Sequence, residues 1–246
     1  MNTRAARLAV FVSGGGSNLQ ALLDRFAPGA EAAAQVAAVI ASRPSIGAIA
    51  RAERAGVPVH VLDEREMGAR EVEADHLAER MLAVLAEHEV DLVVLAGYLQ
   101  LLPAAVVRAY SGRVLNIHPA LLPAFGGRGM YGLRVHRAVL AAGACVSGAT
   151  VHWVDEEYDR GQIVAQWPVP VLADDTPESL AARVLAVEHL LLPATIEAVV
   201  GAVVPEAPVV AESFSLVTGR APCEAGIRQL LGEARVHRVL AEPLTT

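Results

Sequence analysis

The side chains best suited to chemistry lie in Asn116-Ile117-His118-Pro119, which follows the apolar pair Val114-Leu115. The apolar residues predict a buried strand, and if the strand persists through Ile117, Asn116 and His118 point to the same side. An amide N–H₂ and an imidazolium N–H directed at one oxygen form an oxyanion hole. Because ligands of α/β sheets bind beyond the carboxyl ends of strands, the motif predicts a site that stabilises an oxyanion there.

Asp159, two residues before Gly161 in an acidic loop, is the candidate carboxylate partner of His118. Such a carboxylate would hold the ring tautomer and raise the pKa of the ring, so that the ring better balances a developing negative charge. The alternative is that His118 only ends a strand and Asp159 is only a loop acid. We favour the functional interpretation because Asn116, His118 and Asp159 each lie at the edge of a predicted element. No serine or cysteine nucleophile accompanies them, so we expect direct attack by a substrate group.

The stretch Ser13-Gly14-Gly15-Gly16-Ser17-Asn18 joins another apolar run to a predicted helix. Backbone N–H groups at such a junction, together with the positive end of the helix, can bind an anion. The dinucleotide fingerprint is not met because Leu19 replaces its third glycine, and the chain has no lysine for a Walker motif. Two interpretations remain equally open: a phosphate site with Ser17 and Asn18 as added donors, or a tight turn with Ser17 as helix cap.

Composition narrows the class of protein. The 246 residues are 54% hydrophobic with a net charge of −7, which suits one α/β domain with a sizeable core. The arginines are scattered, so no nucleic-acid partner is expected. Cys145 and Cys223 lack metal or disulfide spacing, and no metal is expected. Without a signal peptide or a long apolar run, we expect a cytoplasmic protein with no membrane contact.

Strands and helices alternate through the first part of the chain. Apolar runs predict strands at 7–12, 36–41, 57–62, 91–96 and 113–117, and helical spacing predicts helices at 17–26, 46–55, 71–88 and 133–142. This alternation indicates a mostly parallel sheet flanked by helices. Strands at 148–154 and 163–171 and a helix at 177–200 then predict a C-terminal β-hairpin and a long helix that extend the sheet.

Two other sets of polar residues rate lower. Six other histidines show no metal spacing, so each is assigned to the surface or to a satisfied core position; they are His60, His76, His88, His136, His152 and His237. Glu188 lies in an apolar helical stretch, and its pattern alone favours a solvated outer face.

Four segments together resemble the folate-dependent formyltransferases. They are residues 13–20, 95–98, 115–123, and 148–153 continued through Asp159-Arg160-Gly161. The likeness is collinear over about residues 7 to 200. It implies a Rossmann-like N-terminal half and transfer of a formyl group from 10-formyltetrahydrofolate to the amine of glycinamide ribonucleotide (5'-phosphoribosylglycinamide) in purine biosynthesis. We accordingly place one domain at 1–204 and an extension of unknown role at 205–246. The expected partners are small-molecule substrates, and whether the chain forms a homodimer is left open.

The resemblance also implies a role for individual residues. The family's catalytic asparagine, histidine and aspartate match Asn116, His118 and Asp159, and its phosphate loop matches Gly16, Ser17 and Asn18. A glutamate that meets the acceptor matches Glu188, which reverses the interpretation from the pattern alone. The folate-binding positions match Arg70, Leu99, Gln100, Leu101, Leu102 and Asn116.

Three departures from the family pattern concern substrate contacts rather than catalytic groups. Gly15 stands where many members have asparagine, and Gln100 replaces a common basic residue beside the folate. The segment 125–133 is longer than the usual connection and brings in Arg128, which could alter the phosphate or acceptor contacts.

Three other functions remain as alternatives. Methionyl-tRNA formyltransferase shares the Asn-x-His-Pro signature but carries a longer basic C-terminal domain than residues 205–246 provide. Formyltetrahydrofolate deformylase has a regulatory domain before the core, whereas this chain begins at its first strand. A non-catalytic phosphate-binding module would explain the glycine turn but would leave Asn116, His118 and Asp159 unexplained.

Overall fold

The computed structural model describes residues 4–27, 32–63 and 71–200. Its seven-stranded sheet has the order β3-β2-β1-β4-β5-β6-β7. The strands are β1 (Ala6–Val12), β2 (Ala34–Ala41), β3 (Val59–Val61), β4 (Leu92–Leu95), β5 (Val114–His118), β6 (Val146–Trp153) and β7 (Ile163–Pro170). Pairing is parallel from β3 to β5 and antiparallel from β5 to β7. The predicted Rossmann-like, mostly parallel sheet with a C-terminal hairpin is therefore confirmed.

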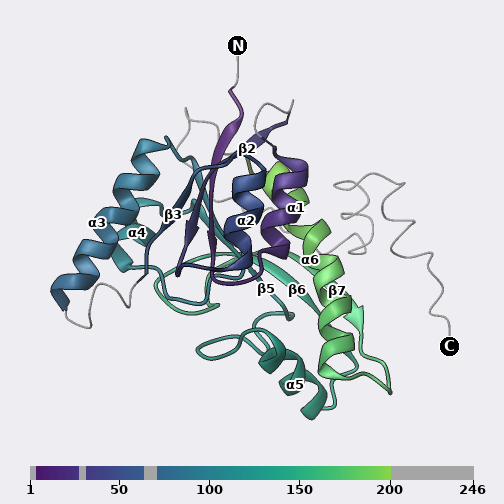
Figure 1. The fold of residues 1–246 in the computed structure, drawn as a ribbon. Coiled ribbons are helices and arrows are strands. Elements are labelled where there is room, and N and C mark those ends of the chain that lie inside the picture. The colour runs from purple at the N-terminus through teal and green to yellow at the C-terminus, as the bar shows by residue number, and fades with distance from the viewer. Residues whose placement is uncertain (1–3, 28–31, 64–70, 201–246) are drawn as a thin grey trace.

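Helices cover both faces of the sheet (Figure 1), with α1, α2 and α6 on one side and α3 and α4 on the other. The helices are α1 (Ser17–Arg25), α2 (Gly47–Arg54), α3 (Glu71–Glu87), α4 (Ala104–Ala109), α5 (Leu133–Ala141) and α6 (Pro177–Val200). Because both faces are covered, the central strands are apolar over most of their length; in β1, residues Leu8 to Val12 are fully buried. In Figure 1, α5 lies below the edge of the sheet at which the parallel strands end.

Helix boundaries follow the sequence closely, but one helix is not predicted. α1 begins at Ser17, as predicted, and its N-cap is Gly16 in the left-handed conformation with φ 74°, so the open alternative that Ser17 is the helix cap is wrong. The six-residue helix α4, which follows Pro103, is not predicted because a helix of fewer than two turns is too short for its apolar residues to show a helical period.

Some predictions fall on parts of the chain that the structure does not describe. Arg70 and the extension at 205–246 lie outside the described residues. Within the described ranges, none of the helices combines the length and the apolar character that crossing a membrane requires.

The close approach of Gly16 to helix α2 predicts a stability difference between two glycines of similar φ. A Cβ at Gly16 would lie 2.7 Å from the Cβ of Ala48, whereas a Cβ at Gly56, with φ 69°, would meet nothing within 4 Å. Gly56→Ala should therefore lose only about 1 kcal/mol from left-handed backbone strain. Gly16→Ala should lose about 2–4 kcal/mol because overlap with Ala48 adds to that strain. Urea unfolding of both variants measures the difference, and equal losses would contradict the close packing.

Candidate functional site

The candidate site forms where the sheet changes from parallel to antiparallel pairing. In β5, Asn116 lies opposite Leu95 of β4 and opposite His152 of β6, and His118 lies opposite Thr150. Alternate residues of a strand share a face, and cross-strand neighbours share it too. The pairing therefore puts an amide and two imidazoles on one face, at the carboxyl end of the last parallel strand.

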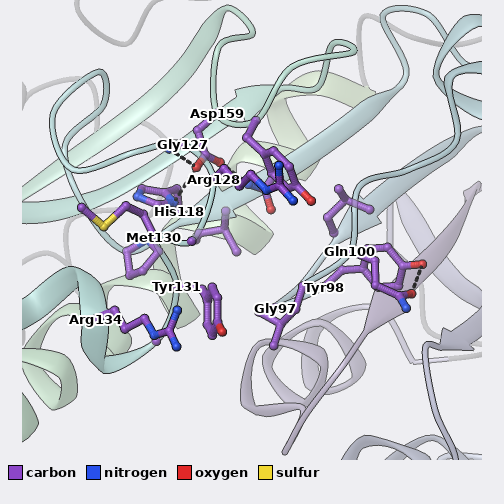
Figure 2. A pocket seen from close by; sticks show the side chains of 18 of the residues that line it. Gly97, Tyr98, Gln100, His118, Gly127, Arg128, Met130, Tyr131, Arg134 and Asp159 are labelled. Carbon is purple, nitrogen blue, oxygen red and sulfur yellow. Dashed lines mark hydrogen bonds and ion pairs between the residues drawn. The ribbon is translucent and has the colours of Figure 1, made fainter. Parts of the chain in front are cut away.

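Asp159 reaches this face from the loop between β6 and β7. Its backbone is left-handed with φ 54°. Its Oδ2 accepts a hydrogen bond from the Gly127 N–H at 2.8 Å and lies 3.5 Å from Nδ1 of His118. Its Oδ1 lies 3.4 Å from Nδ2 of Asn116. Figure 2 shows Asp159, Gly127 and His118 grouped at one side of a cavity. The structure thus brings the three predicted catalytic side chains together.

The charges of this group differ in one respect from the expectation. Burial alone would raise the pKa of Asp159, but the nearby His152 ring, the His118 charge and the Gly127 amide outweigh it, so the pKa is lowered and the carboxylate is ionised. Burial lowers the pKa of His118, and the opposing effects of Asp159 and the Phe125 carbonyl do not overcome it. The expected rise in the pKa of His118 is therefore wrong, because only 3% of this residue is exposed.

Each ring nitrogen of His118 faces an oxygen atom. Nε2 lies 2.9 Å from the carbonyl oxygen of Phe125, which can only accept, so Nε2 carries a hydrogen. In the neutral ring Nδ1 then carries no hydrogen, and it can donate to Asp159 Oδ2, 3.5 Å away, only when the ring is protonated. Donation from the neutral ring to a substrate oxygen consequently requires Nε2 to leave the Phe125 carbonyl.

His152 belongs to the site, although its sequence pattern assigns it to the surface or the core. Its Nδ1 donates to the carbonyl of Trp153 at 2.8 Å, so in the neutral ring Nε2 accepts a hydrogen bond from Nδ2 of Asn116 at 3.0 Å. This contact directs one amide hydrogen of Asn116 toward the ring and leaves the other on the side of Asp159. Only the pairing of β6 with β5 reveals this role, since His152 has no spacing signal of its own.

Asn18 of α1 and Glu188 of α6 form a second polar group. Nδ2 of Asn18 donates to Oε2 of Glu188 at 2.6 Å, and both residues are buried. Burial raises the pKa of Glu188, and the Asn18 hydrogen bond opposes this only in part. The outer-face interpretation of Glu188 is therefore wrong, and the inward position that the family resemblance implies is the one observed.

One cavity of about 640 Å³ joins these two groups. Asn18, Glu188, Asn116, His118, His152 and Asp159 all line it, as do Leu99, Gln100, Leu101 and Leu102. Leu99 and Leu101 are 46% and 45% exposed, an unusual degree for leucine that provides an apolar rim. Gln100 accepts a hydrogen bond from the Tyr98 hydroxyl at 2.9 Å.

The long segment after Pro119 closes the other side of the cavity. Residues 127–134 line it, and the Arg134 guanidinium lies 4.8 Å above the centre of the Tyr131 ring (Figure 2). Arg128 also lines the cavity, as the departure from the family pattern anticipated. Across the described ranges, no three His, Cys, Asp or Glu side chains are arranged to hold a metal ion.

Comparison with known proteins gives a consistent result. The sequence profile of the family described as Formyl transferase matches residues 6–196. The chain is 47% identical over 189 residues to "Phosphoribosylglycinamide formyltransferase, chloroplastic" of Arabidopsis thaliana, covering 76% of this chain and 63% of that protein. It is 40% identical over 196 residues to the human "Trifunctional purine biosynthetic protein adenosine-3", covering 80% of this chain and 18% of that protein.

Solved structures agree with the sequence comparison. Glycinamide ribonucleotide transformylase 1 from Symbiobacterium toebii has a TM-score of 0.71 and 41% identity, covering 80% of this chain and 88% of that one. Phosphoribosylglycinamide formyltransferase from Brucella melitensis has a TM-score of 0.71 and 40% identity, covering 83% and 100%. The chain spans 62–63% of the length of the two plant relatives.

The opposing effects on His118 predict a titration result. Asp159→Asn removes the charge that raises the pKa of His118, so this pKa should fall further below its ordinary value of 6.5. NMR titration of the ring protons measures the change. Asp155→Asn, in the same loop, is the matched control and should leave the His118 titration in place. A rise of the His118 pKa in Asp159→Asn would contradict the arrangement.

The buried carboxyl group of Glu188 predicts a pH-dependent stability. The pKa of Glu188 in the folded protein is raised above the ordinary value of 4.5. Burial of this carboxyl group therefore costs no stability below that pH, where the group is protonated in both states, and the free energy of unfolding falls as the pH rises toward and through the raised pKa. Glu188→Gln keeps a partner for Asn18 without a charge, and its Tm should gain on the wild type between pH 5 and 8. Thermal unfolding across this range is the measurement. A Tm difference that stays constant with pH would contradict the raised pKa.

Proposed function

Since this chain belongs to the formyl transferase family, we propose that it transfers the formyl group of 10-formyltetrahydrofolate to the amine of 5'-phosphoribosylglycinamide. The names of the relatives support the acceptor, and the family supports a folate-derived donor. We propose further that these small molecules are its substrates and that it acts in the cytoplasm, without metal, nucleic acid or membrane.

The observation that carries the proposal is the convergence of two polar groups in one cavity. Asn116, His118 and Asp159 supply donors and a charge for a reacting carbonyl. Asn18 of α1 and Glu188 of α6 line the same cavity. A reaction between two substrates needs both a place for the chemistry and a place for the second substrate. This arrangement favours transfer to an acceptor over a module that only binds phosphate.

The reaction begins with attack of the acceptor amine on the formyl carbon. A new carbon–nitrogen bond forms, and the carbonyl oxygen becomes an oxyanion that Asn116 and His118 stabilise by hydrogen bonds. The bond from the formyl carbon to N10 of the folate then breaks. The amine loses one proton and N10 gains one, relayed by a water, so that formylated acceptor and tetrahydrofolate leave.

The ionised carboxylate of Asp159 supports His118 electrostatically during the reaction. Burial keeps His118 mostly neutral at pH 7, so the ring enters the reaction as a neutral donor. As negative charge develops on the substrate oxygen, Asp159 stabilises any positive charge that the ring acquires. His152 binds one amide hydrogen of Asn116 and the second is directed at Asp159, so Asn116 binds the substrate oxygen when that second hydrogen turns away from the carboxylate.

Separate parts of the cavity hold the two substrates in this proposal. The acceptor's phosphate binds the N–H groups of Gly16, Ser17 and Asn18 at the start of α1, and Glu188 contacts the glycinamide end. The folate lies along the apolar rim, against Leu99, Gln100, Leu101 and Leu102, with Asn116 at its formyl group. Arg70, whose folate contact the family resemblance implies, is part of the same proposal.

The decisive experiment mixes the purified full chain with 10-formyltetrahydrofolate and 5'-phosphoribosylglycinamide and follows the folate absorbance. Turnover that requires the acceptor supports the proposal. Release of formate without acceptor would instead support a deformylase, and no turnover at all would support the binding module. Either of these two results would overturn the proposed transfer.

Variants of the catalytic group test the mechanism. His118→Ala removes one oxyanion donor and should lower kcat by about 10²–10³ while changing KM far less. Asp159→Asn removes the charge that supports His118 and should likewise lower kcat far more than it changes KM. His76→Ala, on the exposed side of α3, is the matched histidine control and should keep wild-type turnover. Wild-type kcat in either of the two catalytic variants would disprove the assignment.

A further inference from the structure

Three successive carbonyl groups of the glycine turn are bound from one side. Ser13 O accepts from Nη2 of Arg43 at 3.0 Å, and Gly14 O accepts from the Ala48 N–H at 3.1 Å. Gly15 O accepts from Nε of Arg51 at 2.8 Å. All three donors belong to the segment that runs from the end of β2 into α2, so this segment turns the three carbonyls toward itself.

The direction of the carbonyls fixes the direction of the N–H groups. In a trans peptide the C=O of one residue and the N–H of the next point in opposite directions. The N–H groups of Gly14, Gly15 and Gly16 are therefore directed away from α2. Successive N–H groups that point to one side form an anion-binding concavity, and the adjacent start of α1 adds the positive end of a helix.

Arg51 is held more firmly than an ordinary surface arginine. Besides Gly15 O, its guanidinium binds Oε1 of Gln20 through Nη1 at 3.0 Å, and Gln20 in turn donates to Asp24 at 2.8 Å. The rigid fork of one guanidinium thus connects the glycine turn, α1 and α2. A positive group on the carbonyl oxygen also polarises the peptide, which makes the opposite N–H a stronger donor.

We propose that Arg51 is a positioning residue for phosphate binding, which holds the Gly15 carbonyl away from the ligand and so aims the Gly16 N–H at it. The inference rests on the proposed function, since the phosphate is that of the proposed acceptor. Arg51 acts through the backbone, not by touching the ligand. Its role is therefore in acceptor recognition and not in the chemical step.

The test compares Arg51→Met with Arg54→Met, an exposed arginine three residues further along the same helix. In Arg51→Met, calorimetry should show ribose 5-phosphate binding about tenfold or more weaker, and KM for the acceptor should rise by a similar factor. Its kcat and its KM for the folate should stay within about twofold of the wild type, as expected when only ground-state binding is lost. Arg54→Met should match the wild type in all four quantities.

A second variant separates positioning from charge. Arg51→Lys keeps the positive charge but cannot bind Gly15 O and Gln20 together with the same planar geometry, so it should restore only part of the affinity. Full restoration by lysine, or equal loss of folate and phosphate binding in Arg51→Met, would overturn the positioning role. Circular dichroism of each variant verifies that it is folded.

The phosphate measurement also separates this inference from the proposed function. Ribose 5-phosphate binding that depends on Arg51 supports the inference even if the chain transfers no formyl group. A wild-type chain that transfers formyl but shows no ribose 5-phosphate binding would overturn the inference and leave the proposed function intact.

Discussion

The carboxylate of Asp159 is the contact on which the arrangement of the site depends. Three segments meet there: β5 through Asn116 and His118, β6 through His152, and the long connection through the Gly127 amide. Its burial opposes ionisation, and the combined effects of His152, His118 and the Gly127 N–H outweigh that burial and keep the carboxylate ionised. The left-handed backbone at Asp159 is the strain that such a loop accepts when surrounding contacts determine its conformation.

The reversal of strand direction at β5 explains why polar groups gather at this place. The parallel strands β3, β2, β1, β4 and β5 bring their carboxyl ends to one edge, and the central ones are mostly apolar because helices cover both faces. β6 runs back along β5, so it returns residues of its own to the same edge. Thr150 shows the structural use of this geometry, because its buried hydroxyl donates to Ala120 O at 2.6 Å and accepts from Leu122 N at 3.0 Å. These bonds fix the chain that follows His118.

The sequence predicts most of this fold because apolar runs and helical periods record burial directly. Asn116 and His118 could be found in the same way, from their alternation at the end of a strand. His152 could not, because its role depends on the register between β5 and β6, which no local pattern contains. Glu188 required the family resemblance, since an acid among leucines is ordinarily solvated. The direction of the His118 pKa required knowing how deeply the ring is buried, which depends on segments far along the chain.

The hydrogen bond from Asn18 to Glu188 joins residues 170 positions apart. The ribosome synthesises Asn18 long before Glu188. The apolar side of α1 is therefore exposed in the nascent chain until α6, which packs on it, has been made. The polar pair that lines the cavity forms only when α6 has emerged and docked. Translation that halts before α6 would yield a chain that contains β1 to β7 but lacks the cavity lining and the apolar cover that α6 supplies.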